Sequence, residues 1–110
     1  MASTEAGTTT ESAVLAFLSQ PGSYPEPTSR VTQVDTHLSS VFLTYDCAYK
    51  LKKPLKRPFL DLSTLAARER NCRAELRLNR RLAAEIYLAV VPVVRTAEGG
   101  LRLGGPGAPV

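Results

Sequence analysis

The sequence has few cysteines, a single histidine, no tryptophan and no long hydrophobic run. Its two cysteines, Cys47 and Cys72, form no CxxC motif, and with His37 alone beside them the chain cannot supply the four ligands of a structural zinc site. The longest apolar run, Ile86–Val94, has nine residues, which is less than half of a membrane span. We therefore expect neither a structural zinc site nor a transmembrane segment.

The N-terminus, MASTEAGTTTES, has no basic region and no long apolar core, so the sequence predicts no secretory signal. Without such a signal, we expect a cytoplasmic protein in which both cysteines stay reduced. Hydrophobic residues make up 44% of the 110 residues and charged residues 22%, which is typical of one small globular domain rather than a disordered chain.

Positive charge is concentrated in the middle of the chain. Between Lys50 and Arg81 lie eleven basic and three acidic residues, a balance of +8, whereas the rest of the chain carries −4. A basic centre of this kind favours an anionic partner, either a nucleotide, another phosphate ligand or a nucleic acid.

The pattern of apolar residues and turn formers predicts an α+β domain preceded by an extension. We expect residues 1–30 to be flexible, with residues 1–10 mobile and a short helix at Glu11–Gln20 capped by Ser12, before a proline-rich connector. After this connector, runs of β-branched residues predict strands, and glycine and proline predict the turns and loops between them. They comprise strands over Val31–Lys52 with a bend at His37–Ser40 and a turn at Tyr45-Asp46, a loop at Lys53–Asp61, a strand at Ile86–Thr96, a turn at Ala97–Gly100, a return strand at Leu101–Leu103, and no element over residues 104–110.

One amphipathic helix is predicted from Thr64 to Ala83, capped by Ser63 or Asp61. Its apolar face must cover the antiparallel strands, because no other element is available to do so. Glu75 projects into this apolar face, where an unpaired carboxylate would be costly.

Lys50 and Lys52 lie on one face of their strand, because side chains alternate with a period of two. A strand lysine held by a helix glutamate is the pair with which kinases bind nucleotide phosphates, and Lys50 with Glu75 fits that pattern. The alternative is that both lysines are solvated and Glu75 reaches solvent. His37 is a further candidate for a ligand site at the first bend, but a histidine on the surface or in packing explains it better. The basic loop could contact phosphate or an acidic partner, and the arginines of the helix could contact nucleic acid, but solvated surfaces explain both sets better. These are Lys52, Lys53, Lys56 and Arg57 in the loop, and Arg70, Arg73, Arg77, Arg80 and Arg81 in the helix.

Several sequence blocks between Val31 and Gly105 resemble the start of the bacterial aminoglycoside-phosphotransferase-like kinases. The blocks are THLSSVFLT, AYKLKKP, FLDLST, CRAELRLNRRLA and YLAVVPV, followed by GLRLGG, and they span about two thirds of the chain. AYKLKKP with ELRLNRRL at this separation is typical of a subgroup that often carries the kinase-like domain ahead of a P-loop ATPase domain.

The resemblance implies that residues 31–110 form a protein-kinase-like N-lobe of about five antiparallel strands and one long helix. It implies ATP as the nucleotide, with Lys50 matching the phosphate-contacting lysine and Glu75 its helix partner, although Lys52 remains open as the phosphate contact. The family transfers phosphate to a small-molecule hydroxyl.

The family's catalytic aspartate and metal ligands lie in a C-terminal lobe for which this sequence has no counterpart. We therefore expect a fragment or truncated product without turnover alone, with Mg²⁺ only where that lobe is supplied, and a separately encoded lobe is one candidate partner. We expect no membrane partner. The alternative function is a small basic nucleic-acid-binding domain, which the scarcity of aromatic residues among the arginines disfavours.

Overall fold

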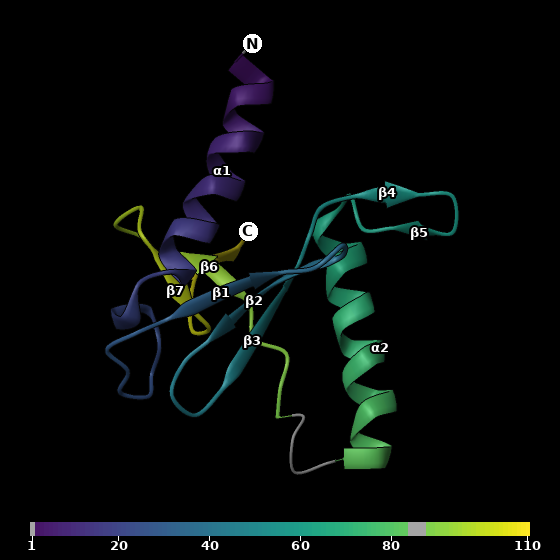
Figure 1. Ribbon diagram of the computed structural model, residues 1–110. Helices are drawn as coiled ribbons and strands as arrows, with labels where there is room; N and C mark the ends of the chain where they lie inside the picture. The colour runs from purple at the N-terminus through teal and green to yellow at the C-terminus, as the bar shows by residue number, and fades with distance from the viewer. Residues whose placement is uncertain (1, 84–87) are drawn as a thin grey trace.

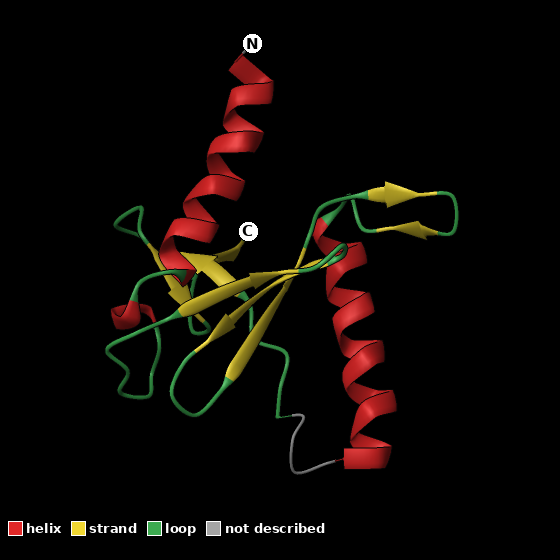
Figure 2. Ribbon diagram, viewed as in Figure 1, coloured by secondary structure: helices red, strands yellow, loops and turns green. Residues whose placement is uncertain are grey.

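The computed structural model describes residues 2–83 and 88–110 and shows a mixed arrangement of two helices and short antiparallel strands (Figures 1 and 2). The α+β character expected from the sequence is confirmed, whereas the expected single sheet is not, because the strands form three separate sheets. In chain order the elements are α1 (Ala2–Leu18), the 3-10 turn η1 (Pro21–Ser23), β1 (Thr32–Asp35), β2 (Ser39–Leu43), β3 (Ala48–Lys52), β4 (Lys56–Arg57), β5 (Leu60–Asp61), α2 (Leu65–Ala83), β6 (Val93–Arg95), β7 (Leu101–Leu103) and β8 (Ala108–Pro109).

The first sheet has the order β1-β2-β3, with both pairs antiparallel. Its strands and turns follow the sequence prediction closely, since the bend between β1 and β2 contains His37 and the connection between β2 and β3 contains Tyr45 and Asp46. The register places Lys52 opposite Ser39 and Lys50 opposite Val41. Both lysines therefore lie near the end of the sheet at which β1 turns into β2.

The third sheet has the order β7-β6-β8, and β6 is shorter than the predicted strand. The prediction ran from Ile86 to Thr96; residues 84–87 lie outside the described part of the chain, and residues 88–92 are irregular. Pro92 explains the late start of β6, because proline has no N–H to donate to a neighbouring strand. Val93 and Val94 are both buried, as expected for a strand covered on two sides.

The C-terminal segment, in which the sequence predicted no element, returns to pair β8 with β6. Gly107 permits this return, since its φ is 141° and an added Cβ would lie 2.5 Å from the carbonyl oxygen of Arg95. The return strand β7 and the turn before it are as predicted.

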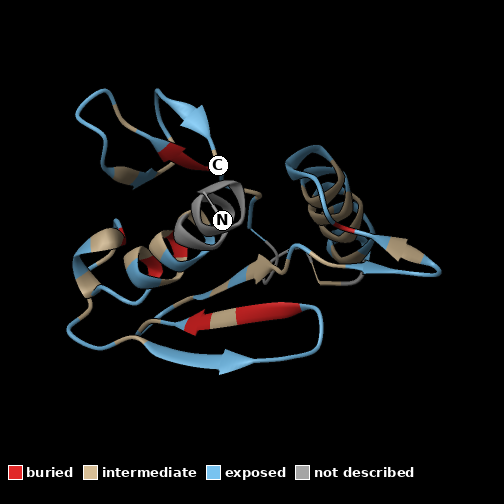
Figure 3. Ribbon diagram, turned by 90° about the horizontal axis from the view of Figure 1, so that it is seen from above, coloured by how far each residue is buried: buried red, intermediate tan, exposed pale blue. Residues whose placement is uncertain are grey.

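The buried core lies where the C-terminal end of α1 meets β2 and β6 (Figure 3). Phe42 of β2 is fully buried, and it packs with Val14 and Leu18 of α1, Tyr24 and Val93. The prediction that the helix at 64–83 covers the strands is therefore wrong. The described side chains of α2 are half-buried or exposed, and none belongs to this core, which α1 and the third sheet cover instead.

The segment before Arg30 is joined to the first sheet by side-chain contacts. The ring of Tyr24 packs against Tyr49 of β3 with centroids 4.7 Å apart, and its hydroxyl donates to the carbonyl of Leu18. Burial, followed by the nearby charge of Glu26, raises the pKa of Tyr24 to about 12. The helix begins at Ala2 rather than at Glu11, so residues 2–10 are helical where mobility was expected and Ser12 lies inside the helix instead of capping it.

The N-terminus of α2 is capped by Thr64, whose Oγ1 accepts a hydrogen bond of 3.1 Å from the amide of Ala67. The predicted caps were Ser63 and Asp61, but these bond to each other, with the Asp61 carboxylate accepting from the amide and hydroxyl of Ser63.

The predicted loop at Lys53–Asp61 contains the hairpin β4–β5, which projects beside the start of α2 in Figure 1. Among the described residues, no helix has the length and apolar character needed to cross a bilayer.

Candidate functional site

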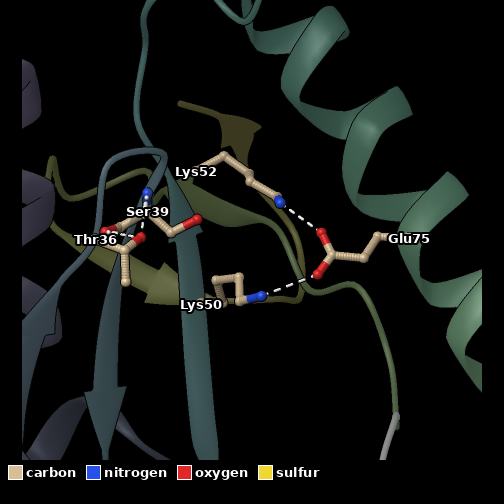
Figure 4. A network of polar contacts seen from close by, with 5 residues as sticks. All are labelled: Thr36, Ser39, Lys50, Lys52 and Glu75. Atoms are coloured by element: carbon tan, nitrogen blue, oxygen red, sulfur yellow. Dashed lines mark hydrogen bonds and ion pairs between the residues drawn. The ribbon is translucent and has the colours of Figure 1, made fainter.

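Two lysines of β3 and one glutamate of α2 meet in a single cluster, which we call the Lys–Glu cluster (Lys50, Lys52 and Glu75; Figure 4). The Nζ of Lys50 lies 3.0 Å from Oε1 of Glu75, and the Nζ of Lys52 lies 2.5 Å from Oε2. Each carboxylate oxygen therefore accepts from a different ammonium group. The structure brings together the predicted residues Lys50 and Glu75, while their role in cofactor binding stays a prediction.

The local structure explains why these side chains converge. Lys50 and Lys52 are two residues apart on β3, so their side chains leave the same face of the sheet. Glu75 is near the middle of α2, and Figure 4 shows its side chain extending from the helix towards both lysines. The cluster thus joins a strand and a helix that are linked by the β4–β5 hairpin.

The two lysines differ in exposure although they share a partner. The side chain of Lys52 is 9% exposed, that of Lys50 is 49% exposed, and that of Glu75 is 30% exposed. Partial burial alone would raise the pKa of Glu75, but hydrogen bonds from Lys52 and Lys50 and the charges of both ammonium groups lower it below its ordinary value. With two cations and one anion, the cluster carries a net charge of +1 at neutral pH.

An open pocket of about 450 Å³ adjoins the Lys–Glu cluster and is lined on its other side by the bend between β1 and β2. The bend residues at the pocket are Thr36, His37, Leu38 and Ser39. Thr36 fixes the bend: its amide donates to the Ser39 carbonyl at 2.8 Å, and its hydroxyl oxygen accepts from the Ser39 amide at 3.1 Å. The structure therefore places His37, a candidate from the sequence, beside the lysines.

Sequence reasoning did not single out Thr36, and it named Lys53 only as a member of the basic loop. The Nζ of Lys53 donates to the carbonyl of Thr36 at 2.5 Å, and this contact borders a second shallow pocket with Asp35 and His37. A threonine three residues before a serine at a strand end is typical of a side-chain-stabilised turn, so Thr36 had a readable signal. The contact of Lys53 with the bend had no such signal, because only the folded backbone brings the two together.

Cys72 is half-buried one helical turn before Glu75, and burial raises the pKa of its thiol, with the neighbouring charges acting in both directions. Cys47 is also a free thiol. Within residues 2–83 and 88–110, no group of three or more His, Cys, Asp or Glu side chains is arranged to hold a metal ion.

Most of the other basic residues lie on exposed surfaces, whereas Arg68 is half-buried and donates to the carbonyl of Leu62 at 2.9 Å. Lys56 and Arg57 are exposed on β4, and the helix arginines 70, 73, 77, 80 and 81 are exposed on α2. Arg73 pairs with Glu69 at 2.9 Å, which is the i, i+4 pair expected on a solvated helix face. Nucleic-acid binding by this face stays a prediction.

Comparison with known proteins identifies three related chains, each 46% identical to this one over 56 residues. They are uncharacterized proteins of Mycobacterium bovis and of two strains of Mycobacterium tuberculosis, H37Rv and CDC 1551. The aligned segment covers 51% of this chain and 11% of each relative, so the match spans about a ninth of their length. No family model matches the chain, and no solved structure matches it significantly.

Proposed function

We propose that this chain provides the nucleotide-binding part of an ATP-dependent phosphotransferase whose acceptor is a small-molecule hydroxyl, in a fold related to the kinase N-lobe. The observation that supports the proposal is the Lys–Glu cluster, in which a strand lysine and a helix glutamate are bonded beside an open pocket. A carboxylate that holds an ammonium group in place prepares it to bind phosphate oxygens. The resemblance of the sequence blocks around Lys50 and Glu75 to aminoglycoside-phosphotransferase-like kinases points the same way.

In this proposal the chain binds and orients the nucleotide but does not carry out the transfer alone. Phosphoryl transfer requires a residue that positions the acceptor hydroxyl and a site for Mg²⁺, which neutralises charge on the phosphates. The described residues offer no cluster for a metal ion. We assign both functions to a further lobe, either in the same polypeptide or in a separate partner chain.

The proposal is tested by titrating the chain with Mg-ATP in a calorimeter and comparing Lys50→Ala and Glu75→Ala with the unaltered chain. Loss of a charged hydrogen bond is worth about 1.5–3 kcal/mol, so we expect binding to weaken by about 10- to 150-fold in both variants. Lys56→Ala is the matched control, since it removes an exposed lysine from β4 outside the pocket. Equal affinity in all four proteins, or no binding by the unaltered chain at millimolar nucleotide, would contradict the proposal.

A further inference from the structure

The outer side of α2 carries five exposed arginines in a row, which we call the arginine stripe. At about 100° per residue they fall within an arc that is also about 100° wide, on the side of the helix opposite to Glu75. Within the described residues, the only ion pair of the stripe joins Arg73 to Glu69. The members of the stripe are Arg70, Arg73, Arg77, Arg80 and Arg81.

The stability of α2 does not account for the arginine stripe. Arginines three and four residues apart repel one another, so they weaken the helix. The helix dipole favours Arg80 and Arg81 in the last turn, but its effect does not extend to Arg70 or Arg77. Packing does not offset the repulsion, since no described residue of α2 belongs to the core. A bound anion along the stripe would remove it.

The β4–β5 hairpin adds an apolar tip to this side of the chain. Phe59 lies in the turn of the hairpin and is completely exposed. The base of the hairpin is fixed, because Leu62 is buried, its amide donates to the carbonyl of Leu55 at 2.7 Å, and its carbonyl accepts from Arg68. Figures 1 and 3 show the hairpin projecting past α2, away from the first sheet. The hairpin tip and the arginine stripe therefore both face away from that sheet.

The chemistry of these two features fits double-stranded DNA. A guanidinium group binds phosphate through two parallel hydrogen bonds, and α2 carries arginines but no lysine. The stripe is about 17 Å long, and duplex DNA presents about ten phosphates over that length. Proteins that bind DNA insert apolar side chains such as phenylalanine and proline between base steps. Pro58 and Phe59 offer such a wedge directly after Lys56 and Arg57.

Two other polyanions fit less well. Single strands are bound by several aromatic residues on which successive bases stack, and Phe59 is the single aromatic residue between Lys50 and Arg81. A helix that lies on a membrane presents large apolar side chains to the lipid, and the arc of the arginine stripe has none.

We propose that the arginine stripe and the tip of the β4–β5 hairpin form one surface that binds double-stranded DNA irrespective of its sequence. The arginines pair with phosphates, and Phe59 inserts at a base step. The surface lies on the opposite side of α2 from the Lys–Glu cluster, so the proposal does not rest on the proposed function. The aromatic residue that the arginines of the helix lack is supplied by the hairpin.

The test measures the affinity of the full chain for a fluorescently labelled duplex of about 20 base pairs by fluorescence anisotropy, between about 50 and 200 mM salt. The stripe variant combines Arg70→Gln, Arg77→Gln and Arg81→Gln, in which glutamine keeps the helix propensity. Each phosphate contact contributes about 0.9 to the slope of log affinity against log salt. We expect the slope to become shallower by about 2.7 in the stripe variant.

The matched control has the same net charge as the stripe variant but leaves α2 and the hairpin unaltered. It combines Arg30→Gln, Arg95→Gln and Arg102→Gln, which replace exposed arginines elsewhere in the chain. We expect its affinity and its salt dependence to equal those of the unaltered chain.

Phe59→Ala tests the hairpin separately from the charges. Because Phe59 is completely exposed, its replacement should leave the stability of the fold unchanged. We expect the affinity for the duplex to fall by about fivefold or more, which corresponds to the lower end of the range for a stacked aromatic residue. The salt slope should stay the same, since no charge is removed.

Several results would overturn the proposal. They are no binding of the duplex at about 50 mM salt, equal losses in the stripe variant and its control, and an unchanged affinity in Phe59→Ala. Tighter binding to a single strand of the same sequence would also overturn it, as would binding to phosphatidylserine vesicles without binding to the duplex.

Discussion

Replacement of Glu75 by glutamine tests whether the Lys–Glu cluster stabilises the fold as well as shaping the pocket. Glutamine has the same size as glutamate but no charge, so Glu75→Gln leaves packing unchanged while both lysines lose their counter-ion. One of the amide's two polar ends can still accept a hydrogen bond, and the other presents donors to an ammonium group. The variant therefore isolates the electrostatic contribution of the carboxylate.

The expected loss follows from the exposure of each partner. Exposed ion pairs contribute about 0–1 kcal/mol, which is the range for Lys50, with its side chain 49% exposed. Removing one partner of a fully buried pair costs about 3–5 kcal/mol. Lys52 is nearly buried but Glu75 is 30% exposed, so the pair lies between these limits. We expect Glu75→Gln to lower the free energy of unfolding by about 1–3 kcal/mol at pH 7.

The assay is urea unfolding followed by far-ultraviolet circular dichroism, since the chain has no tryptophan to report on. The pH dependence gives a sharper test than the size of the loss. The pKa of Glu75 in the folded chain lies below the ordinary carboxyl value of 4.5, so its stabilising effect is complete above that value. It is lost as the pH falls through the lower folded pKa. The difference between the variant and the unaltered chain should therefore shrink below pH 4.5.

Glu69→Gln is the matched control, because Glu69 lies on the same helix but pairs with Arg73 on an exposed face. We expect this variant to lose only about 0.3–0.5 kcal/mol. Two results would refute the reasoning. Equal losses in Glu75→Gln and Glu69→Gln would show that burial of Lys52 has no energetic effect, and a loss that stays constant between pH 7 and pH 3 would show that the charge of Glu75 is not its cause.

Two further predictions concern parts of the fold that the sequence did not reveal. Tyr49→Phe removes the hydroxyl that donates to both carboxylate oxygens of Glu26 at 2.8 Å but keeps the ring that packs against Tyr24. We expect a loss of about 1–2 kcal/mol in urea unfolding with nucleotide affinity unchanged, and an unaltered stability would mean that this bond does not hold the N-terminal segment. Thr64→Ala removes the cap of α2 and should cost about 1 kcal/mol, measured by thermal unfolding. Ser63→Ala should cost less, and the reverse order would restore Ser63 as the cap.

The Lys–Glu cluster was predictable because it depends on local periodicity. A period of two puts Lys50 and Lys52 on one face of β3, and a turn of 100° per residue puts Glu75 on the inner face of α2. The residues of the β1–β2 bend and the β2–β3 turn are likewise set by nearby sequence. The bend and the turn can be predicted without knowing which elements pack together, whereas the meeting of Lys50 with Glu75 also requires α2 to lie beside β3.

The remaining features depend on choices between distant segments that local patterns do not determine. Phe42 needs an apolar partner, and both α1 and α2 could offer one; the structure uses Val14 and Leu18 of α1. The pairing of β8 with β6 depends on Gly107 allowing a close approach to Arg95, and glycine in a sequence indicates freedom rather than a particular path. The division into three sheets follows from the same distant pairings.

The position of α1 has a consequence for the candidate site. Because α1 covers the core, the described residues of α2 contribute nothing to it, and the bonds of Glu75 to Lys50 and Lys52 are the side-chain hydrogen bonds that join described residues of α2 to the first sheet. The placement of Glu75 therefore depends on charge more than on packing.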